Sequence, residues 1–172
     1  QNKKVILFVA ADVRDERKGI KYILDIIPKS PEYTFVSMGK AVENINLENF
    51  IQLGYITERE VINEIYSMAD LFVIPSLDEN FPTTVLEAFA NNTPVVGFNT
   101  GGISEQISED CGRIVRQISD IELEKAIKEV LKNDEILNKL SLNSRKRFEE
   151  KYGLEVFVKN YQKIYDDIYN LY

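Results

Sequence analysis

Residues 70–106 read DLFVIPSLDENFPTTVLEAFANNTPVVGFNTGGISEQ, and this stretch decides the fold. Its first apolar run, 71–74, stops at a Pro-Ser pair, which is typical of a buried parallel strand. We predict a helix over 83–91, a second strand over 95–98, and a short helix after the glycine pair 101–102. This alternation of strand, loop and helix predicts an open α/β sheet, in which ligands bind beyond the carboxyl ends of the strands.

Two carboxylates stand at the predicted mouth of that sheet. Glu79 lies on the loop, and Glu87 lies one to two turns into the helix. Ionised carboxylates accept hydrogen bonds and donate none, so the pair suits the vicinal hydroxyls of a sugar. Thr84 and Glu87 also fit the S/T-x-x-E capping box, in which Glu87 would only satisfy a backbone N–H. The spacing leaves both interpretations open.

Strands and helices continue to alternate on both sides of this stretch. We predict further strands at 4–11, 34–38, 50–53 and 111–115, and further helices at 20–27, 57–68, 119–131, 134–151 and 154–172. Capping boxes are expected at Thr57-x-x-Glu60 and at Ser119-x-x-Glu122. The expected fold is a doubly wound, Rossmann-like parallel sheet with C-terminal helices, forming one domain over 1–172.

Two helices carry apolar stripes that predict packing. In the helix at 57–68 the stripe is Val61, Ile62, Ile65 and Met68. The last helix has a wide, tyrosine-rich stripe. We expect part of that stripe to pack on this domain and the excess to contact another domain. Its members are Phe157, Tyr161, Ile164, Tyr165, Ile168, Tyr169 and Tyr172.

Composition excludes several classes of function. The 172 residues are 44% hydrophobic and 28% charged, as in one ordinary globular domain. A net charge of −7 without a basic run argues against general nucleic-acid binding, and the absence of histidine excludes histidine catalysis. The single cysteine, Cys111, suits a reducing compartment. No signal peptide or membrane-length apolar run is visible, which indicates a cytoplasmic protein, and the start at Gln1 without Met indicates a fragment.

A family resemblance rests on the central stretch. The spacing Glu79-x7-Glu87, followed by TPVV and then GGISE, resembles the signature of the retaining, nucleotide-sugar-dependent glycosyltransferases of family 4, also called group 1. The similarity runs along the whole chain and matches only the second, donor-binding domain of their GT-B fold. It implies an enzyme that transfers a sugar from a nucleoside diphosphate sugar, with retention, to a glycan or lipid-linked acceptor in surface polysaccharide synthesis. An N-terminal acceptor domain, absent from this chain, would be the partner and the sole route to peripheral membrane contact.

The resemblance also assigns a diphosphate site at Lys18-Gly19. The family has an arginine five or six residues before this lysine, where this chain has Asp12 and Val13. Arg14 is our expected substitute, with Arg17 as the alternative. Without the resemblance, a lysine at this position would be read as a solvated surface charge.

The remaining site residues are carried over from the same motifs. Glu79 would contact the transferred sugar and take part in catalysis, and Glu87 would bind the ribose. The start of the central helix would offer backbone amides to phosphate and sugar, although a proline stands where the family has glycine; its residues are Phe81, Pro82, Thr83, Thr84 and Val85. Gly102 and Glu105 would line the same cleft, although Glu105 is otherwise an ordinary surface acid. Tyr55-Ile56 match the nucleobase segment, where Tyr55 either stacks on the base or belongs to the core.

No D-x-D motif is present, so we expect neither an essential metal nor a cofactor. Lysine and helix N-termini would neutralise the diphosphate instead. A UDP-sugar is expected in preference to a GDP-sugar. Two other functions stay open. One is a sugar-nucleotide epimerase of the same fold, and the other is a non-catalytic α/β interaction module that uses its tyrosine-rich C-terminal face.

Overall fold

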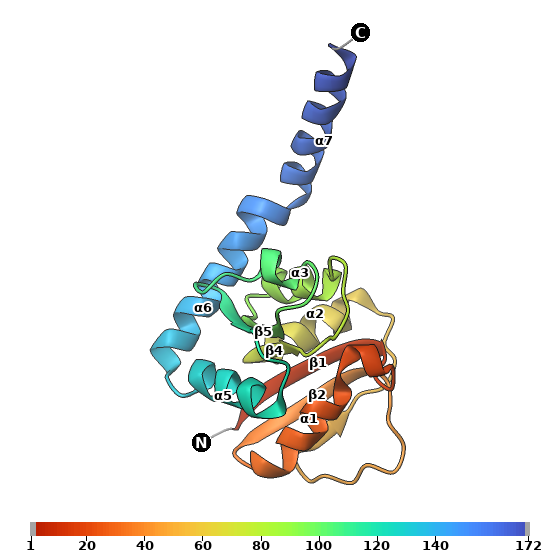
Figure 1. The fold of residues 1–172 in the computed structure, drawn as a ribbon, viewed down its shortest axis with the longest axis vertical. Helices are drawn as coiled ribbons and strands as arrows, with labels where there is room; N and C mark the ends of the chain where they lie inside the picture. Colours follow the sequence, from red (N-terminus) through yellow and green to blue (C-terminus); the bar gives the residue numbers. More distant parts are fainter. Residues whose placement is uncertain (1–2, 171–172) are drawn as a thin grey trace.

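Six parallel strands form the central sheet in the computed structural model, which describes residues 3–170. The strands are β1 (Lys4–Asp12), β2 (Tyr33–Lys40), β3 (Phe50–Gln52), β4 (Leu71–Ile74), β5 (Val95–Phe98) and β6 (Gly112–Val115). Their order is β3-β2-β1-β4-β5-β6, and Figure 1 labels the four central strands. The chain winds outward from β1 in one direction and from β4 in the other, so the doubly wound prediction is confirmed. Between β1 and β4 lies the switch point, where such sheets open a crevice.

Helices cover both faces of this sheet. They are α1 (Ile20–Ile26), α2 (Arg59–Met68), α3 (Thr83–Ala90), α4 (Ile103–Gln106), α5 (Asp120–Leu131), α6 (Asp134–Arg147) and α7 (Leu154–Tyr169). Side chains of α1, α5 and the first half of α6 pack on one face, and those of α2, α3 and α4 pack on the other. In β1, Ile6 and Phe8 belong to the first core and Leu7 to the second. Burial on both faces explains why these strands are apolar at nearly every position.

The helix starts follow local capping chemistry in some places only. Ser119 caps α5 as predicted, because its Oγ accepts the N–H of Ile121 at 3.2 Å. The box predicted at Thr57 is wrong. The N-cap of α2 is Glu58, which makes no side-chain cap bond and instead accepts the N–H of Thr57 at 3.2 Å.

The apolar stripe predicted for α2 is also partly wrong. Ile65 is buried, but Val61 and Met68 are exposed, and the buried neighbour of Ile65 is Tyr66. The helix therefore presents the face that holds positions 62, 65, 66 and 69 to the sheet. Sequence reasoning missed this rotation because it did not count the tyrosine ring as core.

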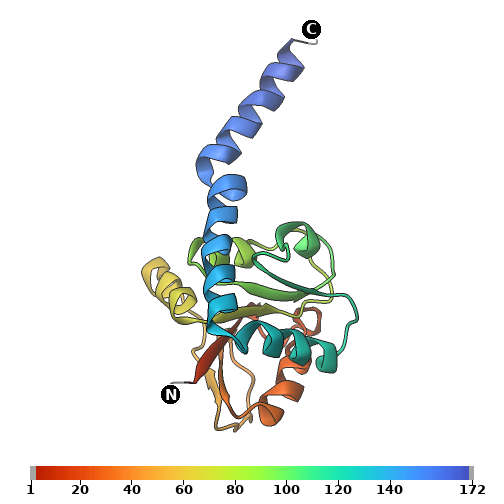
Figure 2. The ribbon, with the colours of Figure 1, turned by 90° about the vertical axis from the view of Figure 1, so that its left-hand side faces the viewer.

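The C-terminal helix projects away from the domain. A π-helical turn, Phe148–Tyr152, follows α6, and α7 continues from Gly153 away from the sheet (Figures 1 and 2). No residue of α7 is buried, so the prediction that part of its stripe packs on this domain is wrong. The helix runs beyond the reach of the sheet and its covering helices, and Tyr172 lies outside the described residues. No helix within residues 3–170 is long and apolar enough to cross a membrane.

Candidate functional site

A hollow lies beyond the carboxyl end of β1, at the switch point of the sheet. Two pockets share the end of that strand, residues 9–11, as a common floor. The larger, of about 590 Å³, is also lined by Met38, Gly39, Tyr55, Ile56, Thr57, Arg59, Ile62, Asn63 and Glu87. The smaller, of about 340 Å³, is also lined by Lys18, Glu79, Phe81, Pro82, Thr83 and Thr84. The fold thus gathers most of the predicted site residues around one continuous depression.

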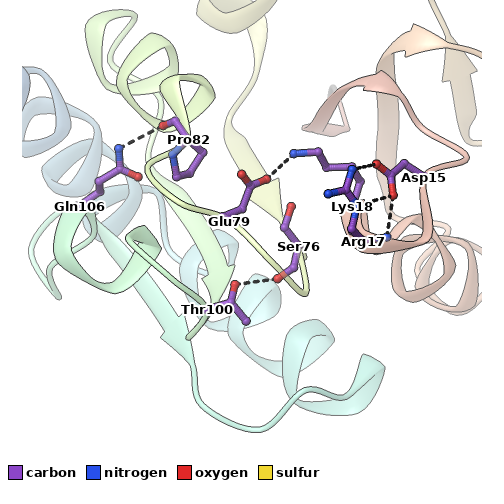
Figure 3. Close-up of polar contacts among 8 residues, drawn as sticks. All are labelled: Asp15, Arg17, Lys18, Ser76, Glu79, Pro82, Thr100 and Gln106. Carbon is purple, nitrogen blue, oxygen red and sulfur yellow. Dashed lines mark hydrogen bonds and ion pairs between the residues drawn. The ribbon is translucent and has the colours of Figure 1, made fainter.

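An ion pair bridges the smaller pocket. Lys18 Nζ lies 2.5 Å from Glu79 Oε1, which joins the loop after β1 to the loop after β4 (Figure 3). The Glu79 side chain is only 12% exposed and that of Lys18 31%, so the alternative of a freely solvated Lys18 is wrong. An ammonium group and a carboxylate therefore meet in a partly desolvated place, where a ligand phosphate and a ligand hydroxyl would each find a partner.

Glycines allow the loops around this pair to approach each other closely. Gly101 has a φ of 48°, and a Cβ there would lie 1.5 Å from the carbonyl oxygen of Glu79. Its neighbour Gly102 donates its N–H to the carbonyl of Asn80 at 2.7 Å. Gly19 has a φ of 72°, and a Cβ there would lie 2.0 Å from the carbonyl oxygen of Pro75. Gly102 therefore supports the Glu79 loop from behind, and it is not among the residues that line either pocket.

Two side-chain hydrogen bonds hold the same loop at both ends (Figure 3). Thr100 Oγ1 donates to the carbonyl of Ser76 at 2.7 Å, and Gln106 Nε2 donates to the carbonyl of Pro82 at 3.0 Å. Sequence reasoning missed both residues. Threonine and glutamine in these places carry no signal in the sequence, because their partners are carbonyls 24 residues away.

The Glu87 side chain bonds a tyrosine and does not cap a helix. Its Oε2 accepts the hydroxyl of Tyr66 at 2.9 Å. The capping-box interpretation is wrong, because α3 already begins at Thr83 and its N-cap is Pro82, which has no N–H to offer. Glu87 consequently stands in the second turn, where it lines the larger pocket.

The start of α3 supplies fewer free amides than predicted. Val85 is buried and donates its N–H to the carbonyl of Pro82 at 3.3 Å. Thr83 and Thr84 line the smaller pocket. These two positions therefore hold the amides best placed for an anion.

Both candidate arginines are engaged with neighbouring acids. Arg14 makes a bidentate contact with Asp12, at 2.9 and 2.7 Å, and this hydrogen bonding holds the pKa of the Asp12 carboxyl well below its ordinary value. Arg17 does the same with Asp15, at 3.2 and 2.8 Å (Figure 3). Neither arginine lines the hollow, so a phosphate contact by Arg14 stays a prediction that requires this pair to open.

The remaining predicted residues divide between the hollow and the surface. Tyr55 is 70% exposed and lines the larger pocket, so the alternative that it belongs to the core is wrong. Glu105 is exposed on α4 and lines neither pocket; its carbonyl accepts from Arg147 at 3.0 Å. Arg59 and Asn63, one helical turn apart on α2, line the larger pocket and were missed by sequence reasoning.

Comparison with known proteins identifies the family of this chain. The family model for glycosyl transferases group 1 matches residues 1–147. The chain belongs to this family.

Among curated relatives of this group 1 domain is an uncharacterized glycosyltransferase of Methanocaldococcus jannaschii. It is 27% identical over 171 residues, covering 94% of this chain and 48% of that protein. The alpha-galactosylglucosyldiacylglycerol synthase of Streptococcus pneumoniae is 26% identical over 174 residues, covering 91% of this chain and 46% of that protein. The chain thus spans about half the length of these relatives.

Solved structures share the fold. A sucrose-phosphate synthase from Thermosynechococcus elongatus matches with a TM-score of 0.86 and 22% identity, covering 99% of this chain and 47% of that one. The Anabaena protein HepE, in complex with UDP and glucose, matches with a TM-score of 0.79 and 20% identity, covering 97% of this chain and 48% of that one. These two similarities confirm the expected α/β fold class.

Proposed function

We propose that this chain is the donor-binding half of a retaining, family 4 glycosyltransferase. The observation that carries the proposal is the shared hollow, which places the Lys18–Glu79 pair beside the first amides of α3 and connects both to Glu87 and Tyr55. A nucleoside diphosphate sugar has a base, a diol, a diphosphate and a hexose in that sequence. The larger pocket contains the residues proposed for the base and the diol, and the smaller pocket contains those proposed for the diphosphate and the hexose.

Each part of the donor has a proposed partner. The base would lie against Tyr55 and Ile56, and the ribose hydroxyls would donate to Glu87. The diphosphate would take Lys18 and the amides of Thr83 and Thr84, with Arg14 as a further contact after release from Asp12. Glu79 would contact the transferred sugar and stabilise its reacting centre. Stabilisation by lysine and amides requires no metal, and we retain UDP as the preferred nucleotide, supported by the complex of the related-fold Anabaena protein.

The full enzyme would add an N-terminal acceptor domain. Its presence is supported by the length of the relatives, about twice that of this chain. The exposed stripe of α7 would dock on this N-terminal domain. Its side chains, such as Phe157, Tyr161 and Ile168, are each about half exposed and offer an apolar surface. The acceptor would be a glycan or a lipid-linked sugar in surface polysaccharide or glycolipid synthesis. The enzyme would be cytoplasmic, with membrane contact only through the N-terminal domain.

The test is a calorimetric titration of the 172-residue chain with UDP-glucose, GDP-mannose and free uridine. We expect weak binding of one nucleotide sugar, because half of the cleft is absent, and unchanged binding when a chelator is added. Glu87→Ala should weaken it while lowering the free energy of unfolding by about 1–3 kcal/mol, since the buried Tyr66 hydroxyl loses its acceptor. An affinity that is unchanged in Glu87→Ala would contradict the ribose assignment.

A transfer assay separates this proposal from its rivals. We expect no sugar transfer by the chain alone and transfer by a version extended with its N-terminal domain, because both reactants must be held in one geometry. Epimerisation of the nucleotide sugar without any acceptor would instead identify an epimerase. Failure of both versions to bind any nucleotide sugar would favour a non-catalytic interaction module.

A further inference from the structure

Tyr66 is a buried tyrosine on the last turn of α2, on the side of the sheet that carries α3. Its side chain has no exposure to solvent, and its ring packs edge-on against Phe72, with centroids 5.8 Å apart and an interplanar angle of 79°. Its hydroxyl donates to Oε2 of Glu87 at 2.9 Å, and Glu87 lines the larger pocket. A ring locked in a close-packed core gives this hydroxyl a defined position.

The protonation state of Tyr66 makes it a dedicated donor. Burial, with a further contribution from the negative charge of Glu87, raises the pKa of the Tyr66 phenol far above its ordinary value. The phenol therefore keeps its proton throughout the physiological range, and the carboxylate must be the acceptor. Among residues 3–170, the hydrogen bonds to the Glu87 side chain involve Oε2, and Oε1 receives none.

The two helices that carry this pair are held in register by further bonds. Thr93 Oγ1 donates to the carbonyl of Tyr66 at 2.7 Å, in a buried position. Asn91 Nδ2 donates to the carbonyl of Glu87 at 2.9 Å. Both residues lie in the turn that follows α3, so this turn ties the backbone of α2 to the backbone of α3. The Tyr66–Glu87 contact is thereby part of a supported arrangement.

We propose that Tyr66 is a positioning residue for Glu87: its hydroxyl holds Oε2 so that Oε1 faces the ribose hydroxyls of the bound nucleotide. This inference rests on the proposed function, because it assumes that a nucleotide occupies the larger pocket. A glutamate side chain has several rotatable bonds, and one that is already fixed loses less freedom when the ligand binds. Tyr66 never touches the nucleotide and acts only through the carboxylate.

The test compares a ribose nucleotide with an analogue that lacks the hydroxyls. The affinities of the 172-residue chain and its Tyr66→Phe variant are measured for UDP and 2′,3′-dideoxy-UDP, and in parallel for GDP and its dideoxy analogue. We expect Tyr66→Phe to weaken binding of the ribose nucleotide about tenfold and of the dideoxy analogue less than about twofold. A role in packing alone would weaken both equally.

Tyr22→Phe is the matched control. Tyr22 is partly buried and packs edge-on against Phe98, with ring centroids 5.0 Å apart, at the core on the opposite face of the sheet. The Tyr22→Phe substitution also removes a tyrosine hydroxyl, and we expect it to leave all four nucleotide affinities unchanged. Thermal unfolding of both variants verifies that they fold.

The outcomes separate this inference from the proposed function. Equal loss for ribose and dideoxy nucleotides, or no loss for either, would overturn the role of Tyr66 while leaving the nucleotide site in place. A wild-type chain that binds UDP and dideoxy-UDP equally well would show that Glu87 does not contact the ribose, and would also overturn it. A wild-type chain that binds no nucleoside diphosphate would overturn the proposed function and this inference together.

Discussion

Replacing Lys18 by alanine is the most direct perturbation of the proposed phosphate site. In the free protein the Lys18 ammonium lies 2.5 Å from Glu79 Oε1, so a diphosphate must replace an existing partner. A charge-assisted hydrogen bond to phosphate contributes roughly 1.5–3 kcal/mol. Opening a pair whose lysine is 31% exposed offsets about 1 kcal/mol of that gain. The net loss of roughly 0.5–2 kcal/mol corresponds to about a 2–30-fold weaker affinity for UDP.

The assay is isothermal titration of wild type and Lys18→Ala with UDP and with uridine. We expect the loss to be confined to UDP, because the nucleoside has no phosphate for Lys18 to contact. The variant should also unfold at a lower urea concentration, with a loss on the order of 1 kcal/mol, because Glu79 is left largely buried without its donor. Lys21→Ala removes the same charge from an exposed position on α1 and serves as the control. Equal losses for UDP and uridine, or an equal effect of Lys21→Ala, would refute the phosphate assignment.

Glu79→Gln removes the negative charge that pairs with Lys18, so calorimetry should find that UDP binds a few-fold more tightly. The variant should bind UDP-glucose no more tightly than UDP, because the proposed contact with the sugar is lost. Weaker UDP binding would contradict this prediction. Gly101→Ala should lower the urea-unfolding free energy by more than Gly54→Ala, since both positions have positive φ, worth about 1–2 kcal/mol, but only Gly101 meets a carbonyl oxygen; equal effects would rule out the clash. Burial raises the pKa of the Cys111 thiol, so alkylation by iodoacetamide at pH 8 should be slow until urea unfolds the chain, and rapid native-state labelling would show that Cys111 is accessible.

Local patterns predicted most of the fold. The apolar runs at 71–74 and 95–98 are fully buried strands, because only a strand covered on both faces is apolar at every position. The N-cap of α5 was also predicted correctly. Ser119 accepts the N–H of Ile121, which is only two residues away, so a short sequence pattern is enough to reveal it. The expected location of the site at the carboxyl ends of the strands agrees with the hollow, because parallel topology brings all the connecting loops from those ends together.

Predictions that depended on distant partners were less successful. Glu87 was compatible with a cap or a ligand, and its contact with Tyr66, 21 residues earlier, was not visible. The stripe on α7 indicated burial, yet a stripe does not say whether this domain or another surface covers it. The supporting contacts of Thr100 and Gln106 also join residues far apart in sequence.

The sequence by itself determined the order of strands and helices along the chain and the glycines at the tight approaches. These properties depend on side-chain period and backbone freedom, which act over a few residues. Only the tertiary structure decided that Lys18 pairs with Glu79 and that Tyr66 holds Glu87. Side chains take these partners when packing brings separate loops and helices within hydrogen-bond distance, and no short-range pattern encodes that distance.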